Sequence, residues 1–296
     1  MFEKVLVALD FSHYSQKILN RVSEIPGISE VVLLHVIDAT SPSRLEWTPG
    51  PHLENANNLM KEKKENLENL GLKVTVNVDV IVNAVTRAPV SRAILKVAET
   101  EKVSLIVIGA RGINPIQELL LGSVSSFVLR HAKTNVLVMH FLPTPNQTEV
   151  SLESCQQKLF SKVLVPTDFS PSAGNASELL KTIPGIEEIV ILHVITRAES
   201  QAEIEVSKRE AQIRLEDIKK KFIDGGVNVS LQVRAGDPAT IILAVAEEAN
   251  VSLIAMNAFG LDWLREMLLG STTFTVVRRA TRPVLVLRTG KEKNTT

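Results

Sequence analysis

The segment LIVIGARG, residues 105–112, says most about how the first half of this chain folds. Its four leading apolar residues are typical of a buried strand, and Gly109 and Gly112 follow where that strand ends. After nine further residues, Gly122 and Ser123 precede a stretch with helical spacing. Because glycine lets the backbone come close to an anion, and because the first N–H groups of a helix favour negative charge, this order predicts a phosphate-binding loop. A plain surface turn capped by Ser123 is the alternative.

The same pattern returns in the second half of the chain with one difference. Asn257 stands where the first half has Gly109, while Gly260, Gly270 and Ser271 keep the spacing. Asparagine tolerates the left-handed αL backbone conformation better than most residues, so we expect the turn to persist. We also expect the Asn257 side chain to occupy space that a phosphate or ribose would need. The sequence leaves nucleotide binding by the second half open.

The chain contains an internal duplication. The segment KVLVALDFS at residues 4–12 returns as KVLVPTDFS at residues 162–170, an offset of 158. The later matches, such as Gly122 with Gly270, have an offset of 148. The first copy therefore has ten extra residues, which we place in the loop rich in Pro, Ser and Gly at residues 40–53. We predict a first domain over residues 1–141, a linker over 142–159, a second domain over 160–288 and a polar tail over 289–296.

Short apolar runs alternate with helical patterns in each copy. In the first copy the predicted strands are residues 5–9, 31–36, 74–82, 105–108 and 136–139, and the predicted helices are residues 13–24, 55–70, 90–100 and 124–132. Continuous apolar strands separated by helices indicate parallel sheets covered on both faces. The fold class is therefore α/β, with two similar domains that each contain an open five-stranded parallel sheet with helices on both faces. Residues 74–82 alternate valine with polar residues, which predicts a strand at the sheet edge.

Connection rules predict where a ligand binds. In open doubly wound sheets, ligands bind beyond the carboxyl ends of the strands, where the strand order reverses. If the first strand is central and the fourth lies beside it, Asp10 and Gly109 end neighbouring strands and meet in one crevice. Ser12 and Ser170 are predicted helix N-caps, and capping alone is the alternative role of Asp10.

One histidine lies at the end of the second strand in each copy. His35 and His193 have no Cys, Asp or Glu at metal-ligand spacing. We therefore interpret them as structural residues at a strand end rather than as metal ligands.

The composition limits partners and location. The chain has 33 basic residues (lysine plus arginine) and 33 acidic residues (aspartate plus glutamate), so its formal net charge is zero. This balance argues against nucleic acid as a partner, because the positive charge that such binding needs is missing. No apolar run reaches the length of a membrane span, and residues 4–9 form a strand too early for a secretory leader. Cys155 is the single cysteine, which fits a reducing compartment, so we expect a cytoplasmic protein with no membrane partner.

The layout of both copies resembles the universal stress protein family in its tandem, two-domain form. The ATP-binding motif of that family is G-x-x-G, nine residues, then G-[ST], and it is matched at every position by Gly109, Gly112, Gly122 and Ser123. The family's opening V-L-V-x-x-D-x-S is met twice, at residues 5–12 and 163–170. The resemblance covers nearly the whole chain except the linker and the tail.

The resemblance implies a Rossmann-like fold of the adenine nucleotide alpha hydrolase type that binds ATP, ADP or AMP, with Mg²⁺ left open as a companion. It places Asp10 and the backbone around Val36 beside the adenine and ribose, and the glycine motif around the phosphates. Arg111 either reaches a phosphate or remains a solvated loop residue. The candidate residues of the first domain are Asp10, Ser12, Val36, Gly109, Arg111, Gly112, Gly122, Ser123, Val124 and Ser125. Those of the second domain are Asp168, Val194, Asn257, Gly260, Gly270, Ser271 and Thr272.

The resemblance also concerns assembly. The family pairs the fifth strands of two domains, and here residues 136–140 and 284–288 would pair within one chain as an internal pseudo-dimer. A homodimer and an unidentified protein partner stay open.

The expected function is regulatory adenine-nucleotide binding in a stress response, and we name no catalytic or metal-binding residue. The chain lacks a G-x-x-x-x-G-K-[ST] loop and a G-x-S-x-G elbow. One alternative is a slow ATP hydrolase or nucleotidyl-transfer enzyme, so weak ATPase activity stays open. Another is a flavodoxin-like FMN carrier, for which only Phe11 and Phe127 lie near the site in sequence. A third is an interaction module with a vestigial site.

Overall fold

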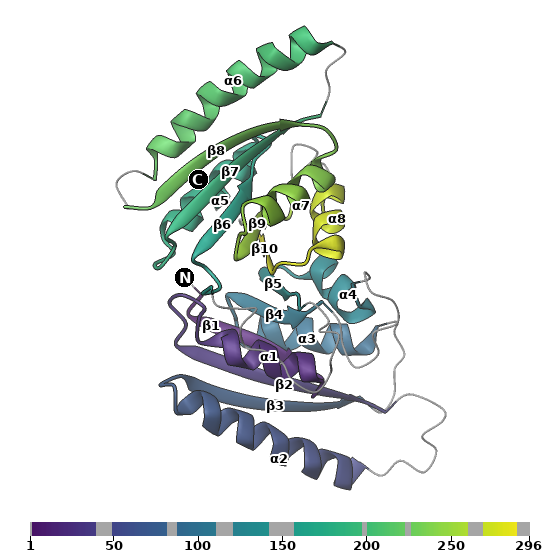
Figure 1. Ribbon diagram of the computed structural model, residues 1–296. Helices are drawn as coiled ribbons and strands as arrows, with labels where there is room; N and C mark the ends of the chain where they lie inside the picture. The colour runs from purple at the N-terminus through teal and green to yellow at the C-terminus, as the bar shows by residue number, and fades with distance from the viewer. Residues whose placement is uncertain are drawn as a thin grey trace, which may run out of the picture. The chain divides into compact units, whose positions relative to one another are not determined.

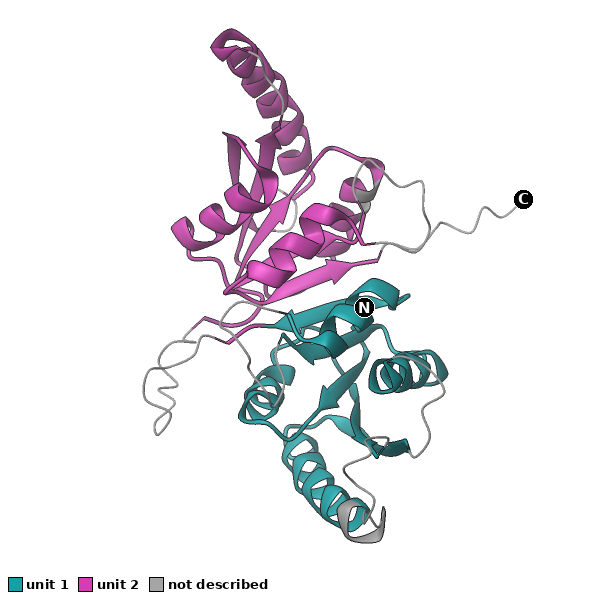
Figure 2. Ribbon diagram, turned by 90° about the vertical axis from the view of Figure 1, so that its right-hand side faces the viewer, with its two compact units in different colours: residues 1–139 teal, residues 140–296 magenta. Residues whose placement is uncertain are grey.

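The structure, a computed structural model, describes residues 2–39, 49–81, 88–110, 121–141, 157–196, 200–222, 226–259 and 269–288. The chain divides into two compact units, residues 1–139 and 140–296 (Figure 2). The units repeat the same order of strands and helices along the chain (Figure 1).

The first unit contains one parallel sheet with the strand order β3-β2-β1-β4-β5. Its strands are β1 (Lys4–Leu9), β2 (Glu30–Asp38), β3 (Lys73–Ile81), β4 (Leu105–Gly109) and β5 (Asn135–Met139). Its helices are α1 (His13–Val22), α2 (Pro49–Glu68), α3 (Pro89–Thr100) and α4 (Ser123–His131). The central position of β1 and the place of β4 beside it confirm the predicted reversal of strand order.

The second unit has the same topology, with the strand order β10-β9-β6-β7-β8, again parallel. Its strands are β6 (Lys162–Pro166), β7 (Glu188–Ile195), β8 (Asn228–Ala235), β9 (Leu253–Asn257) and β10 (Val284–Leu287). Its helices are α5 (Pro171–Lys181), α6 (Gln201–Lys220), α7 (Pro238–Glu248) and α8 (Ser271–Arg279). The predicted α/β class with two five-stranded parallel sheets is confirmed.

Helices cover both faces of each sheet, which explains why the inner strands are apolar throughout. In the first unit α1 packs against β1 and β4, α2 packs against β2 and β3, and α3 packs against α4 and β2. Right-handed connections place α1 and α2 on one face and α3 and α4 on the other. Val5, Leu6 and Val7 of β1 are consequently fully buried. β3 begins the strand order, and of its residues only Val74 is buried, so the edge strand predicted over 74–82 is confirmed up to Ile81.

The extra residues of the first copy are distributed differently from the prediction. Val31 pairs with Val74, and Ile189 pairs with Val229 at the equivalent place, so the offset between the copies is already 155 at β3 and β8. It is 148 at the buried helix residues Ala98 and Ala246. Only three of the ten extra residues therefore lie between β2 and β3, and seven lie between β3 and α3. The placement of all ten within residues 40–53 was wrong.

The third helix starts differently in the two units. In the first unit the cap position is Ala88, which has φ +60° and no side-chain capping bond. In the second unit Oδ1 of Asp237 accepts hydrogen bonds from the Thr240 hydroxyl at 2.6 Å and the Thr240 backbone N–H at 2.9 Å. These bonds lower the pKa of Asp237.

Candidate functional site

The turn after β1 is held by its own polar side chains. Oδ1 of Asp10 accepts a hydrogen bond from the backbone N–H of Ser12 at 3.0 Å and another from the Ser15 hydroxyl. Oγ of Ser12 accepts from the backbone N–H of Ser15 at 3.2 Å, so Ser12 is the N-cap of α1, as predicted. Asp10 is therefore not the cap itself; its carboxylate fixes the turn that presents the cap.

The second unit repeats this turn. Oδ1 of Asp168 accepts from the backbone N–H of Ser170 at 3.0 Å, and Oγ of Ser170 caps α5 by accepting from the backbone N–H of Ala173 at 3.3 Å. Pro171 occupies the first helical position, where its missing N–H costs nothing. Both predicted N-caps are thus confirmed.

Each turn carries a phenylalanine in the left-handed region that stacks on a histidine. Phe11 has φ +59°, and its ring centre lies 4.1 Å from that of His35. Phe169 has φ +61°, and its ring centre lies 4.4 Å from that of His193. An aromatic residue rarely adopts this backbone conformation, so the surroundings must impose it.

The two histidines are anchored to the carbonyl that precedes the turn. Nδ1 of His35 donates to the carbonyl oxygen of Leu9 at 2.8 Å, and Nδ1 of His193 donates to that of Thr167 at 2.9 Å. Burial lowers the pKa of His35, opposed by its bond to Leu9 and by the charge of Asp10. Both histidines thus bond to the backbone near the end of their strand, which agrees with the structural role expected for them. The sequence analysis missed their pairing with Phe11 and Phe169, although both copies repeat these residues at the same offset.

The start of α4 is fixed to the end of β4. The backbone N–H of Gly122 donates to the carbonyl oxygen of Ala110 at 2.8 Å, and the Ser125 hydroxyl donates to that of Gly109 at 2.6 Å. Gly122 is the N-cap residue, and Ser123 begins the helix. The predicted residues Arg111 and Gly112 lie outside the described residues.

The second unit builds the same junction. The backbone N–H of Gly270 donates to Ala258 at 2.8 Å, and the Thr273 hydroxyl donates to the carbonyl oxygen of Asn257 at 2.8 Å. Thr273 therefore corresponds to Ser125, which the sequence analysis did not recognise, although the offset of 148 relates them. Gly260 lies outside the described residues.

Two candidate positions have ordinary backbone conformations. Asn257 is the last residue of β9 and is not among the described residues with positive φ, so its tolerance of the αL conformation is not needed there. Gly122 has φ −60°, which any residue adopts, and a Cβ there would lie 3.5 Å from the Ala110 oxygen, an ordinary contact. The lack of a side chain at Gly122 is therefore not required by the fold. Oδ1 of Asn257 is buried and makes no hydrogen bond to any residue that the structure describes.

The topology brings the described candidate residues to the carboxyl ends of the strands in each sheet. Because β1 lies between β2 and β4, the segments that follow their carboxyl ends are neighbours. The first sheet gathers there Asp10, Ser12, Val36, Gly109, Gly122, Ser123, Val124 and Ser125. The second sheet gathers Asp168, Val194, Asn257, Gly270, Ser271 and Thr272.

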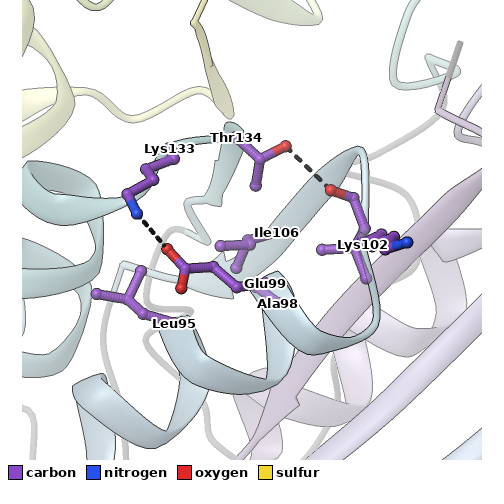
Figure 3. Close-up of a pocket in the computed structure, with 8 residues that line it drawn as sticks. Leu95, Ala98, Glu99, Lys102, Ile106, Lys133 and Thr134 are labelled. Atoms are coloured by element: carbon purple, nitrogen blue, oxygen red, sulfur yellow. Dashed lines mark hydrogen bonds and ion pairs between the residues drawn. The ribbon is translucent and has the colours of Figure 1, made fainter.

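A separate cavity of about 310 Å³ lies at the opposite, amino end of β4 (Figure 3). It is lined by Leu95, Ala98, Glu99, Lys102, Val103, Ile106, Lys133 and Thr134. At its rim Nζ of Lys133 lies 2.8 Å from the Glu99 carboxylate, and this bond raises the pKa of Lys133. The cavity is thus distinct from the carboxyl-edge site.

Two features are absent from the described part of the chain. No group of three or more His, Cys, Asp or Glu side chains gathers there in a way that could hold a metal ion. None of the described helices is both long and apolar enough to span a membrane.

Comparisons with known proteins agree with this architecture. The model of the universal stress protein family matches residues 1–140 and 159–288. A universal stress protein of Methanocaldococcus jannaschii is 32% identical over 155 residues, covering 44% of this chain and 96% of that protein. One of Bacillus subtilis is 32% identical over 149 residues, covering 44% of this chain and 100% of that protein. The crystal structure of a universal stress protein from Archaeoglobus fulgidus aligns with a TM-score of 0.64 at 27% identity, covering 98% of both chains. This chain therefore belongs to the universal stress protein family and contains two domains of that type.

Proposed function

We propose that the first unit binds an adenine nucleotide, ATP, ADP or AMP, at the carboxyl edge of its sheet. The observation that carries the proposal is the junction of β4 and α4, where Gly122 leaves the start of the helix uncovered by a side chain. The first backbone N–H groups of a helix have no acceptor within their own helix, and the helix dipole favours an anion there. Ser123 and Val124 are the residues that would offer these N–H groups to phosphate oxygens.

The turn after β1 offers a group for the ribose. Only Oδ1 of Asp10 is engaged by the described residues, namely by Ser12 and Ser15. Oδ2 of the same carboxylate would accept a hydrogen bond from a ribose hydroxyl without disturbing the turn. Val36, one residue beyond the pairing of Leu9 with His35, would offer its backbone to the base.

Family membership supports the adenine nucleotide as the ligand class. The complete motif formed by Gly109, Gly112, Gly122 and Ser123 is the part of the chain that carries this inference. We propose a regulatory role in a stress response through binding, in which occupancy changes what the site edge presents to a protein partner. Mg²⁺ would accompany the phosphates, held by them rather than by a cluster of protein ligands.

The proposal extends to the organisation of the chain. We place the domain boundaries at residues 1–141 and 160–288, with a linker over 142–159 and a tail over 289–296. We further propose a cytoplasmic location and an internal pseudo-dimer formed through β5 and β10. Binding by the second unit is weaker in this proposal, because Asn257 places a side chain at the end of β9.

The decisive experiment identifies the small molecule that the protein carries. Freshly purified protein is denatured, and the released compounds are identified by mass spectrometry, followed by calorimetric titration of emptied protein with ATP, ADP and AMP. Release of an adenine nucleotide, or its binding in the titration, supports the proposal. A yellow protein that releases FMN would instead support the flavin carrier. Phosphate release during incubation with ATP would establish a hydrolase.

A further inference from the structure

The two units differ in the groups that lie over the phenylalanine of the turn after their first strand, which is Phe11 in the first unit and Phe169 in the second. In the second unit Cζ of Arg214 lies 3.9 Å from the centre of the Phe169 ring, and the His193 ring centre lies 4.4 Å from it at 29°. One face of a benzene ring has room for one group at such a distance. The Phe169 ring therefore lies between the guanidinium and the imidazole, and both of its faces are covered.

The first unit has the same aromatic pair without the guanidinium. The rings of Phe11 and His35 are 4.1 Å apart at 34°, which covers one face of the phenylalanine. Within the described residues no cationic side chain lies over the Phe11 ring. Its second face therefore carries no guanidinium or ammonium group of the described residues.

The residue that corresponds to Arg214 is a leucine. The buried residues Ala56 and Met60 of α2 correspond to Ala211 and Leu215 of α6 at the offset of 155 found for β3 and β8. Leu59 thus takes the position of Arg214. The two units therefore differ at this position of their second helices, with a leucine in the first unit and an arginine in the second.

We propose that the base of the nucleotide stacks on the second face of Phe11, where Leu59 stands in place of an arginine, and that Arg214 holds the corresponding place on Phe169 and excludes a base from the second unit. The inference rests on the proposed function, and it names the residues that select which unit is occupied. A guanidinium is planar and stacks on aromatic rings, so it takes the place that a flat heterocycle would take. The left-handed turn holds each phenylalanine at the carboxyl edge, next to Asp10 or Asp168.

The first test introduces the arginine into the first unit. Leu59→Arg should weaken binding of adenosine and of ATP alike by about tenfold, since stacking of a base on an aromatic side chain has about this value. Asn58→Arg adds the same charge at the neighbouring exposed position and should bind as the wild type. The measurement is calorimetry on the full chain. Wild-type affinity of Leu59→Arg for adenosine would overturn the proposal.

The second test removes the arginine from the second unit. Arg214→Leu should allow a second molecule of adenosine to bind per chain, while Arg209→Leu on the same exposed helix should not. Adenosine is the probe because it has no phosphates to meet Asn257. An unchanged stoichiometry in Arg214→Leu would contradict the role of Arg214.

A third variant guards against a folding defect in Leu59→Arg. Phe11→Leu keeps an apolar side chain but removes the ring, and it should lower adenosine affinity by about tenfold, whereas Phe169→Leu should leave it unchanged. Circular dichroism shows whether each variant is folded. If the wild type binds neither adenosine nor any adenine nucleotide, the proposed function itself fails. If the wild type binds and all three substitutions at positions 11, 59 and 214 are silent, only the present inference fails.

Discussion

The backbone N–H of Gly122 donates to the carbonyl oxygen of Ala110 at 2.8 Å, which ties the start of α4 to the residue after β4. The bond needs no side chain at Gly122, whose φ of −60° is open to all residues. Gly270 makes the same bond to Ala258 in the second unit. Substitutions at these two glycines therefore test access to the helix start rather than the ability to fold.

Gly122→Val should weaken ATP binding by about tenfold to hundredfold while the protein stays folded. The valine side chain would stand over the first N–H groups of α4, which would lose charge-assisted hydrogen bonds to phosphate. Calorimetry measures the affinity, and circular dichroism measures the fold. Gly174→Val is the matched control. Gly174 lies in α5 of the other unit, and a Cβ added there would meet no atom within 4 Å. Unchanged ATP affinity of Gly122→Val would show that this junction does not bind phosphate.

Gly270→Val should have a much smaller effect on ATP binding than Gly122→Val. The two positions have the same backbone geometry, but the second unit also carries Asn257 where the first has Gly109. The comparison is made by calorimetry on full-length chains. A larger loss from Gly270→Val would reverse the ranking of the two units.

Ser12→Ala and Ser170→Ala should each lower the free energy of unfolding by about 1 kcal/mol, the usual contribution of a helix N-cap. Each serine accepts a backbone N–H at the start of its helix, from Ser15 and Ala173 respectively. Urea denaturation followed by circular dichroism measures the change. Ser29→Ala serves as a surface control, since the Ser29 hydroxyl bonds the Glu3 carbonyl outside any helix. An effect no larger than that of the control would contradict the capping role.

The free energy of unfolding should depend on pH through His35. Burial lowers the pKa of His35 in the folded protein from the ordinary value of 6.5, so the unfolded chain binds the proton more readily. The stability that the neutral imidazole contributes is complete above about pH 6.5 and is lost as the pH falls toward the folded pKa. His35→Gln keeps a donor for Leu9 and should show a smaller loss of stability as the pH falls below about 6.5. Denaturation curves at several pH values measure this, and an identical pH profile would count against the assignment.

The two units should remain associated when the linker is cut. β5 and β10 each end the strand order of their own sheet, and an uncovered strand edge exposes backbone donors and acceptors. A protease site inserted near Thr148 and cleaved should yield halves that elute together from a size-exclusion column. Val138→Pro, which removes a backbone donor from β5, should weaken that association. Separate elution of two folded halves would remove the pseudo-dimer proposal.

The sequence by itself determined the fold class, the duplication and the location of the candidate site. Apolar runs such as residues 105–108 could only be buried between layers of helices, and the polar alternation of residues 74–82 marked the edge strand. Ser12 and Ser170 predicted where their helices begin, because capping is a local interaction between residues three positions apart in the sequence. These features depend on short-range chemistry and on periodicity, which a sequence displays directly.

Only the tertiary structure decided what surrounds each side chain at the site. Arg214 is 45 residues from Phe169 in the chain, so no local pattern could show that its guanidinium covers that ring. The extended backbone of Asn257 and the ordinary φ of Gly122 also emerged only from the strand and helix that contain them, whereas residue type alone suggested a left-handed turn. Contacts between distant segments depend on the order of the strands in the sheet. That order is determined by the packing of the whole domain, so no single segment of the sequence reveals it.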